Sequence, residues 1–283
     1  MKKLNFIIKY GLALLLLSFY SCESWLNVTP SDRLSEEMLF NDREGFVKAL
    51  NGVYIELNTN ELYGRNLTAG ALDVMGQYYS VASSSHAFYN YGGLVYTGND
   101  EKALFDNMWQ KCYAVIACCN TIIEKCDENK AGLSPVWKGS IKGEALALRA
   151  MLHFDMLRLF GPLTSELDKE SIPYQTNSDQ TVTPLLSGSE VIGLILDDLK
   201  NAVGLLKDTD PYFVEEEFSD TDLNYRRFRM NYFAAKGLMA RVQLWGGDKE
   251  KAAITAKEVI AEGQAEGAEF FPFVTNSEAT SSN

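Results

Sequence analysis

Histidines are scarce in this 283-residue chain, and familiar catalytic motifs are absent from its sequence. The two histidines are His86 and His153, and there is no G-x-S-x-G elbow, H-E-x-x-H zinc motif or Walker loop. His153 follows Leu152 in a helical pattern of apolar residues, which favours a structural role for its ring. Acidic residues are plentiful, and counting them does not exclude a carboxylate pair for glycoside hydrolysis, because the separation of such a pair is a tertiary property. The sequence nominates no such pair. The sequence therefore favours a binding protein over an enzyme, with no cofactor.

Basic residues are also in short supply. The chain has 26 Lys and Arg against 38 Asp and Glu, a net charge of −12, which argues against nucleic acid or an anionic membrane surface as a partner. The acidic run at 215–222 has the alternate spacing of a calcium loop. However, Tyr225 stands where an EF-hand needs glycine and Asn231 where it needs glutamate. This run is therefore predicted to be a solvated loop, and no metal site is expected.

Only one stretch is strongly apolar, and it lies at the N-terminus. Lys2 and Lys3 precede a short apolar run at 11–19, and Ser21 precedes Cys22. This order is typical of a secretory signal, and the run is too short to span a bilayer. It predicts a lipoprotein signal peptide over residues 1–21, acyl chains such as palmitate on Cys22, and an extended tether over residues 22–35. The alternative is an ordinary cleaved signal followed by a free or disulfide-bonded Cys22.

Four cysteines follow in a short segment, and an exported chain invites a disulfide interpretation of them. Three of them instead share one apolar seam with helical spacings of three and four: Phe105, Met108, Cys112, Val115, Cys119, Ile122 and Cys126. Seven residues of helix rise roughly 10 Å, which exceeds the Cα separation that a disulfide tolerates. Cys112, Cys119 and Cys126 are therefore predicted to be reduced core residues.

Helical periodicity recurs along the rest of the chain, between two loop regions at 60–103 and 163–188. The expected helices are a first one capped by Asn41 or Asp42 and running through residues 46–57, the cysteine helix ending near Asn129, one through 141–159 ended by Gly161-Pro162, one capped by Ser189 and running to 206, one over 226–245, and one through 252–260 after a Gly-Gly-Asp turn. Short helices in pairs predict a mainly all-α fold, a tetratricopeptide-like helical-pair scaffold with long loops.

Three segments together resemble the SusD/RagB family, surface lipoproteins that Bacteroidetes use to capture nutrients, mostly glycans. They are residues 21–30 (SCESWLNVTP), residues 143–162 (GEALALRA through HFD to RLFGP) and residues 234–254, with AAKGLMAR and the GD and AAI of the next helix. The second is the most specific match. In the first, Asn27 stands where the family usually has Asp.

The resemblance implies an organisation and a function. Residues 36–283 are expected to form the N-terminal helical domain of the family, and the C-terminal region that members of the family carry is expected to be missing from this sequence. The expected function is that of an outer-membrane, cell-surface glycan-binding lipoprotein. It would act with a TonB-dependent SusC-like transporter in polysaccharide utilisation. The alternative from the helical pattern is a scaffold that binds a protein or peptide.

The loop region at 60–103 contains the predicted ligand face. Aromatic rings stack on the C–H faces of sugars, while amides bind sugar hydroxyls, and this loop has both kinds of side chain. The predicted ligand-binding residues are Tyr78, Tyr79, His86, Phe88, Tyr89, Asn90, Tyr91, Tyr96 and Asn99. The resemblance implies that this region contributes to the ligand face. The alternative is that several rings anchor the loop to the scaffold.

Overall fold

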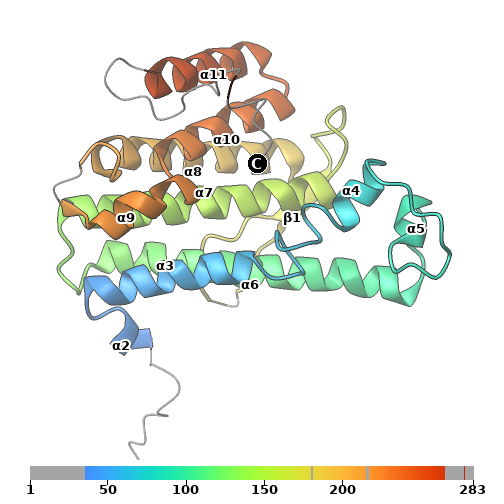
Figure 1. Ribbon diagram of the computed structural model, residues 1–283, viewed down its shortest axis with the longest axis horizontal. Helices are drawn as coiled ribbons and strands as arrows, with labels where there is room; N and C mark the ends of the chain where they lie inside the picture. The colour runs from blue at the N-terminus through green and yellow to red at the C-terminus, as the bar shows by residue number, and fades with distance from the viewer. Residues whose placement is uncertain (1–35, 180, 215–216, 265–276, 278–283) are drawn as a thin grey trace, which may run out of the picture. The chain divides into compact units, whose positions relative to one another are not determined.

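The computed structural model describes residues 36–179, 181–214, 217–264 and 277 (Figure 1). The predicted signal peptide, Cys22 and most of the tether lie outside these residues. The chain forms two units, residues 1–39 and 40–283. In the first unit only α2 (Glu36–Leu39) is described. None of the helices in the described ranges combines the length and the apolar character needed to span a bilayer.

The second unit is mainly helical, as the sequence predicts. Its long helices are α3 (Arg43–Leu57), α6 (Asn99–Glu128), α7 (Pro135–Phe160), α8 (Gly188–Thr209), α10 (Tyr232–Trp245) and α11 (Lys249–Gly263). Its short elements are α4 (Ala71–Met75), α5 (Tyr89–Gly92), strands β1 (Glu170–Pro173) and β2 (Leu185–Ser187), α9 (Asp220–Tyr225) and the 3₁₀ turn η3 (Arg226–Phe228).

The long helices pack against one another in order, as Figure 1 shows. α3 contacts α6, α6 contacts α7, α7 contacts α8, α8 contacts α10, and α10 contacts α11. The two strands pair antiparallel as a small sheet beside α7 and α8. This stacking of helix pairs confirms the tetratricopeptide-like scaffold.

Capping residues set the helix ends. The Asp42 carboxylate accepts the Gly45 N–H at 2.8 Å, which confirms the predicted start of α3. α6 ends at Glu128, its C-cap Asn129 adopts a left-handed conformation, and α7 ends before Gly161. The prediction of Ser189 as the cap of α8 is wrong, because Ser187 forms a capping box with Glu190 two residues earlier.

Four further predictions about local structure are corrected. The loop region at 60–103 contains α4 and α5, and α6 already begins at Asn99. The region at 163–188 contains β1 and β2. In the acidic run, α9 is a short helix with a capping box between Ser219 and Asp222. The helix predicted over 226–245 begins only at Tyr232, because the preceding turn η3 directs Arg226 inward to Glu144 and Asp210.

The cysteine seam of α6 lies in the core. Cys112, Cys119 and Cys126 are free and buried, as predicted, whereas Cys118 is free and exposed. Burial is the largest influence on each of the four thiols, and it raises the pKa of all of them. α7 lies in the middle of the stack and is buried on nearly all sides, which fits its run of alanines and leucines.

Candidate functional site

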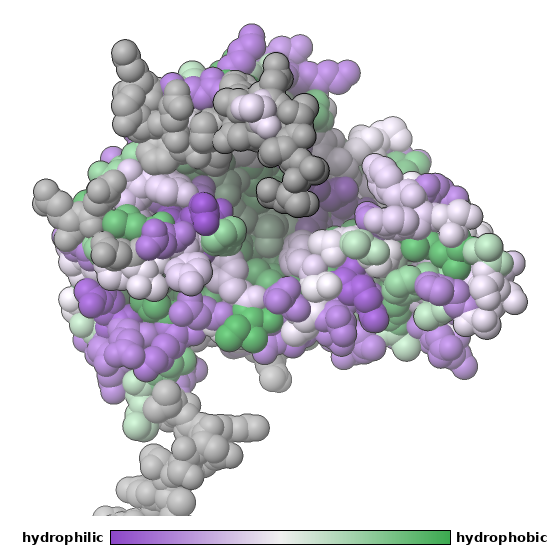
Figure 2. Space-filling view, in the orientation of Figure 1, coloured by the Kyte–Doolittle hydropathy of each residue, from purple (hydrophilic) through white to green (hydrophobic). Residues whose placement is uncertain are grey.

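The segment between α4 and α6, residues 76–98, is called here the aromatic loop. It includes α5 and lies beside α4 at one end of the second unit, where Figure 2 shows hydrophobic patches among pale and hydrophilic residues. Three of its predicted ligand residues are well exposed: Tyr78 at 80%, Tyr79 at 54% and Tyr89 at 43%. Exposed rings of this size are available for a ligand to stack on.

The aromatic loop forms an open surface pocket with a volume of about 460 Å³, called here the tyrosine pocket. Its lining residues are Gln77, Tyr79, Ser80, Val81, Tyr89, Asn90, Gly92, Gly93 and Val95. Three predicted residues, Tyr79, Tyr89 and Asn90, are brought together here. The size falls in the range of small-ligand sites, and two exposed rings beside amide groups suit a sugar.

Two amide side chains hold the walls of the tyrosine pocket. Gln77 has a left-handed backbone (φ 62°), and its Nε2 donates to the carbonyl oxygens of Val74 at 3.3 Å and Gly92 at 3.0 Å. Asn90 Nδ2 donates to Glu101 Oε1 at 2.8 Å, on the first turn of α6. These bonds tie both sides of the loop to each other and to the helical scaffold.

Tyr91 is a correction to the predicted ligand face, because only 2% of it is exposed. Its ring makes an edge contact with Phe105 of α6, with centroids 6.0 Å apart, and packs near Tyr96 and Phe88. Burial, and then the charges of Glu101 and Asp100, raise the pKa of Tyr91 to about 12. Tyr91 therefore anchors the loop, which was the alternative role considered for these rings.

Half-buried Tyr96 and Phe88 belong to the same anchor. Tyr96 packs edge-on against Phe105, with centroids 5.5 Å apart, and the Arg65 guanidinium lies 5.8 Å from the centre of the Phe88 ring. Burial raises the pKa of Tyr96. Neither residue lines the tyrosine pocket.

The remaining predicted residues are exposed but lie outside the pocket lining. They are Tyr78, His86 and Asn99. The His86 Nδ1 accepts the Phe88 N–H at 3.1 Å, which braces the turn before α5. Asn99 is the first residue of α6. The structure thus separates the nine predicted residues into pocket, anchor and open surface.

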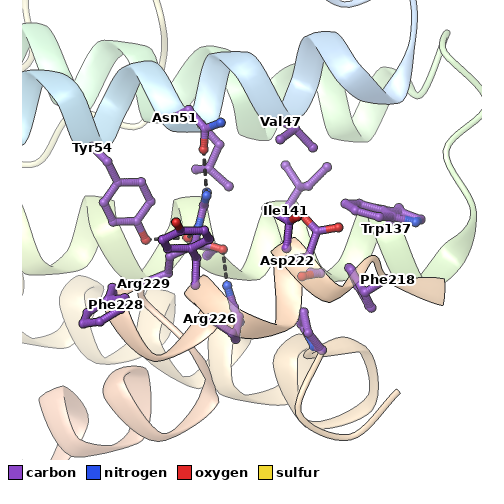
Figure 3. Close-up of a pocket in the computed structure, with 16 residues that line it drawn as sticks. Val47, Asn51, Tyr54, Trp137, Ile141, Phe218, Asp222, Arg226, Phe228 and Arg229 are labelled. Carbon is purple, nitrogen blue, oxygen red and sulfur yellow. Dashed lines mark hydrogen bonds and ion pairs between the residues drawn. The ribbon is translucent and has the colours of Figure 1, made fainter. Parts of the chain in front are cut away.

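A second cavity, of about 410 Å³, lies between α3, α7 and the α9–η3 segment (Figure 3). We call it the α3–α7 pocket. Sequence reasoning missed it, because it forms where segments far apart in the chain meet. Its walls are largely apolar and aromatic, and it is lined by Val47, Leu50, Asn51, Tyr54, Trp137, Ser140, Ile141, Glu144, Pro211, Phe218, Thr221, Asp222, Tyr225, Arg226, Phe228 and Arg229.

The two arginines of the α3–α7 pocket are paired with buried carboxylates. Arg226 pairs with Glu144 and, at 2.6 Å, with Asp210. Arg229 Nε donates to Glu144 Oε1 at 2.8 Å and its Nη1 to Asn51 Oδ1 at 2.7 Å (Figure 3). Burial by itself would raise the pKa of Glu144. The positive charges of Arg226 and Arg229 have a larger effect in the opposite direction, so the pKa of Glu144 lies below its usual value.

This pairing identifies the charged floor of the α3–α7 pocket as structural. The Tyr54 hydroxyl donates to Glu144 and accepts the Met230 N–H at 2.8 Å, which joins α3, α7 and the start of α10. A ligand would have to displace these bonds to use the same groups. In the tyrosine pocket, by contrast, the exposed rings are free to stack.

Within the described ranges, no cluster of three or more His, Cys, Asp and Glu side chains is arranged to hold a metal ion. The buried ring of His153 is also engaged. Its Nδ1–H donates to the Arg149 carbonyl at 2.9 Å, and its Nε2 accepts the Gln175 N–H at 3.0 Å. Burial lowers the pKa of His153 to about 3, so the ring is neutral.

The chain matches a known family over most of its length. A family model described as SusD-like, "starch-binding associating with outer membrane", matches residues 24–244. SusD-like protein P2 of Formosa agariphila is 26% identical over 265 residues, which cover 91% of this chain and 46% of that protein. The chain spans about half the length of the curated relatives that it matches over most of its own length.

Solved structures show the same fold. A SusD-like carbohydrate-binding protein of Bacteroides vulgatus superposes with a TM-score of 0.64 and 23% identity, covering 84% of this chain and 47% of that one. A laminarin-binding SusD-like protein superposes with a TM-score of 0.56 and 16% identity, covering 77% of this chain and 43% of that one.

Proposed function

Because this chain belongs to the SusD-like family of starch-binding proteins associating with the outer membrane, we propose that it is a glycan-binding lipoprotein. It would be anchored through Cys22 and act with a TonB-dependent SusC-like transporter at the cell surface. The laminarin-binding protein of the same fold supports a glycan as the ligand class.

The tyrosine pocket is the observation on which the glycan assignment rests. Tyr79 and Tyr89 present exposed rings beside Asn90 in a cavity of about 460 Å³. An exposed ring matches the apolar C–H face of a sugar, and a neighbouring amide matches its hydroxyls. The anchor beneath the loop keeps these groups in place before the ligand arrives, which lowers the entropic cost of binding.

We infer binding without hydrolysis. His153, one of the two histidines, is buried and has both ring nitrogens engaged with backbone groups. The buried carboxylates Glu144, Asp198 and Asp210 are each paired with an arginine. The oxygens of these carboxylates are engaged with buried arginines, which leaves them poorly placed to act on a bound substrate.

A matched pair of tyrosine substitutions tests the glycan assignment. Tyr89→Ala removes an exposed ring, so oligosaccharide affinity should fall roughly fivefold, since a stacking contact is worth about 1 kcal/mol. The melting temperature should stay nearly unchanged. Tyr91→Ala removes a buried ring and should instead destabilise the fold by about 3 kcal/mol or more.

Titration calorimetry and thermal unfolding, on the chain with any C-terminal continuation of its reading frame, separate these outcomes. Normal oligosaccharide binding by the Tyr89→Ala protein would show that the pocket is not a sugar platform. Peptide binding without any oligosaccharide binding would favour the alternative of a helical scaffold for a protein partner.

The anchor and the partner need separate tests. Cys22→Ala should move the protein from the membrane fraction to the soluble fraction in detergent phase partitioning, because the acyl chains would be lost. An unchanged membrane fraction would argue against the anchor. The proposed partnership predicts that a TonB-dependent transporter, encoded next to the gene for this protein, copurifies with the wild-type protein.

A further inference from the structure

We propose that the tyrosine pocket selects neutral, hydroxyl-rich glycans and rejects glycans that carry carboxylates or sulfates. This inference rests on the proposed glycan function and adds the chemical class of the ligand. It follows from the charges around the pocket and from the direction in which its amides are held.

Charged side chains are absent from the lining of the tyrosine pocket. Residues 66–101, which contain the whole aromatic loop, include Asp73, Asp100 and Glu101 but no Lys or Arg. The 283 residues together carry a net charge of −12. An anionic glycan would therefore meet repulsion both at the site and at longer range.

The two cations nearest in sequence do not compensate. Arg65 Nε donates to Asn66 Oδ1 at 3.2 Å, and its guanidinium lies over the Phe88 ring. Lys102 is exposed on the first turns of α6. Neither residue lines the tyrosine pocket. An acidic sugar in the pocket would thus have no cation among the lining residues to pair with.

The direction of the two amides gives the stronger argument. Both partners of the Gln77 amide nitrogen are carbonyl oxygens, and the partner of the Asn90 amide nitrogen is a carboxylate oxygen. These partners accept hydrogen bonds only, so each amide must present its NH₂ group to them. The opposite orientation would place oxygen against oxygen.

The amide oxygens of Gln77 and Asn90 remain for a ligand, beside the second N–H of the Asn90 amide. Within the described residues, no protein group donates to Gln77 Oε1 or Asn90 Oδ1. Free carbonyl oxygens accept hydrogen bonds, and sugar hydroxyls can donate them. Ionised carboxylate and sulfate groups offer only acceptors, which would face these oxygens unfavourably. Both the charge and the hydrogen-bond pattern therefore favour a neutral polyol.

The Glu101 carboxylate adds to this preference. It is 5% exposed and lies behind Asn90, to whose amide it is bonded. A negative charge held this close to the pocket floor is only weakly screened by salt. An anionic sugar residue stacked on Tyr89, the neighbour of Asn90, would be repelled by it.

A glycan array with neutral and acidic oligosaccharides, followed by calorimetry on the hits, tests the selectivity. The expected result is binding of a neutral oligosaccharide at least tenfold tighter than that of uronic acid or sulfated oligosaccharides of the same length. An acidic oligosaccharide bound as tightly as any neutral one would overturn the inference while leaving the glycan function standing. Binding of neither class would overturn the proposed function, and this inference with it.

A charge added to the pocket provides a second test. Ser80 lines the pocket and is exposed, so Ser80→Lys should fold normally and should strengthen binding of acidic oligosaccharides severalfold at low salt. Ser84→Lys is the matched control, since Ser84 is exposed in the same loop but does not line the pocket. Equal effects of the two substitutions on acidic oligosaccharides would show that the response comes from net charge alone, and would overturn the assignment to the tyrosine pocket.

Discussion

Replacing Glu144 with glutamine tests the charge cluster beneath the α3–α7 pocket. Two carboxylates, Glu144 and Asp210, face Arg226 and Arg229, and all but Arg229 are almost completely buried. Glu144→Gln leaves two guanidinium groups with one carboxylate between them. Removing one partner of a buried ion pair costs about 3 to 5 kcal/mol, because the remaining charge stays desolvated.

For a chain of this size, that loss corresponds to a fall of roughly 10 °C in melting temperature. Circular dichroism of the helices during heating measures it. The matched control is Glu44→Gln on α3, where Glu44 pairs with Lys48 on an exposed surface and no shift in melting temperature is expected.

A double variant tests whether charge balance is the cause. Adding Arg229→Gln to Glu144→Gln leaves Arg226 paired with Asp210 at 2.6 Å, which restores one positive charge for one negative charge. The second substitution should therefore cost much less in the Glu144→Gln protein than in the wild type. Additive costs, or a Glu144→Gln protein as stable as the Glu44→Gln control, would refute this account.

Two further predictions concern buried groups. The pKa of His153 is lowered to about 3 by burial, whereas that of an unfolded histidine is 6.5, so only the unfolded chain takes up this proton between those values. The free energy of unfolding should therefore fall as the pH drops below about 6.5. Denaturant melts at several pH values should show a smaller fall for the His153→Gln protein than for the wild type. The same pH dependence in both proteins would contradict this role of His153. In a Cys22→Ser protein, a thiol reagent should label Cys118 in the native state but Cys112, Cys119 and Cys126 only after denaturation. Rapid native labelling of more than one thiol would argue against the buried seam.

The sequence could predict the long helices because each has a sustained apolar period. The cysteine seam of α6 is such a case, and its three inward cysteines are buried as expected. The short elements could not be predicted in this way. α5 has four residues, and η3 exists because Arg226 turns inward to Asp210 and Glu144, which lie 16 and 82 residues away in the chain. No local period encodes such contacts.

The candidate site shows the same division. Composition identified the aromatic loop, but it did not distinguish Tyr89 from Tyr91, which are two residues apart on α5. Tyr89 is 43% exposed and Tyr91 2% exposed, because Phe105 of α6 contacts the second ring. Which ring faces a ligand is therefore decided by a tertiary contact that the sequence of the loop does not reveal.

The segment that most resembles the family explains why the fold was easier to predict than the ligand. On α7, Glu144, Arg149 and His153 are all buried and bind three other parts of the chain. Glu144 binds the arginines at and after η3, and Arg149 holds Asp198 of α8 through two bonds of 2.7 Å. His153 accepts the backbone N–H of Gln175, just after β1.

In this chain these polar residues connect α7 to α8, to the segment after β1 and to η3, and none of them lines the tyrosine pocket. Removing one of them would leave its buried partner unsatisfied, at a cost of about 1 to 3 kcal/mol or more for a charged group. A signature made of such residues predicts the scaffold. The proposed ligand site lies instead in the aromatic loop, at Gln77, Tyr89 and Asn90, where an exchange of side chains alters the pocket without removing a buried partner from α7.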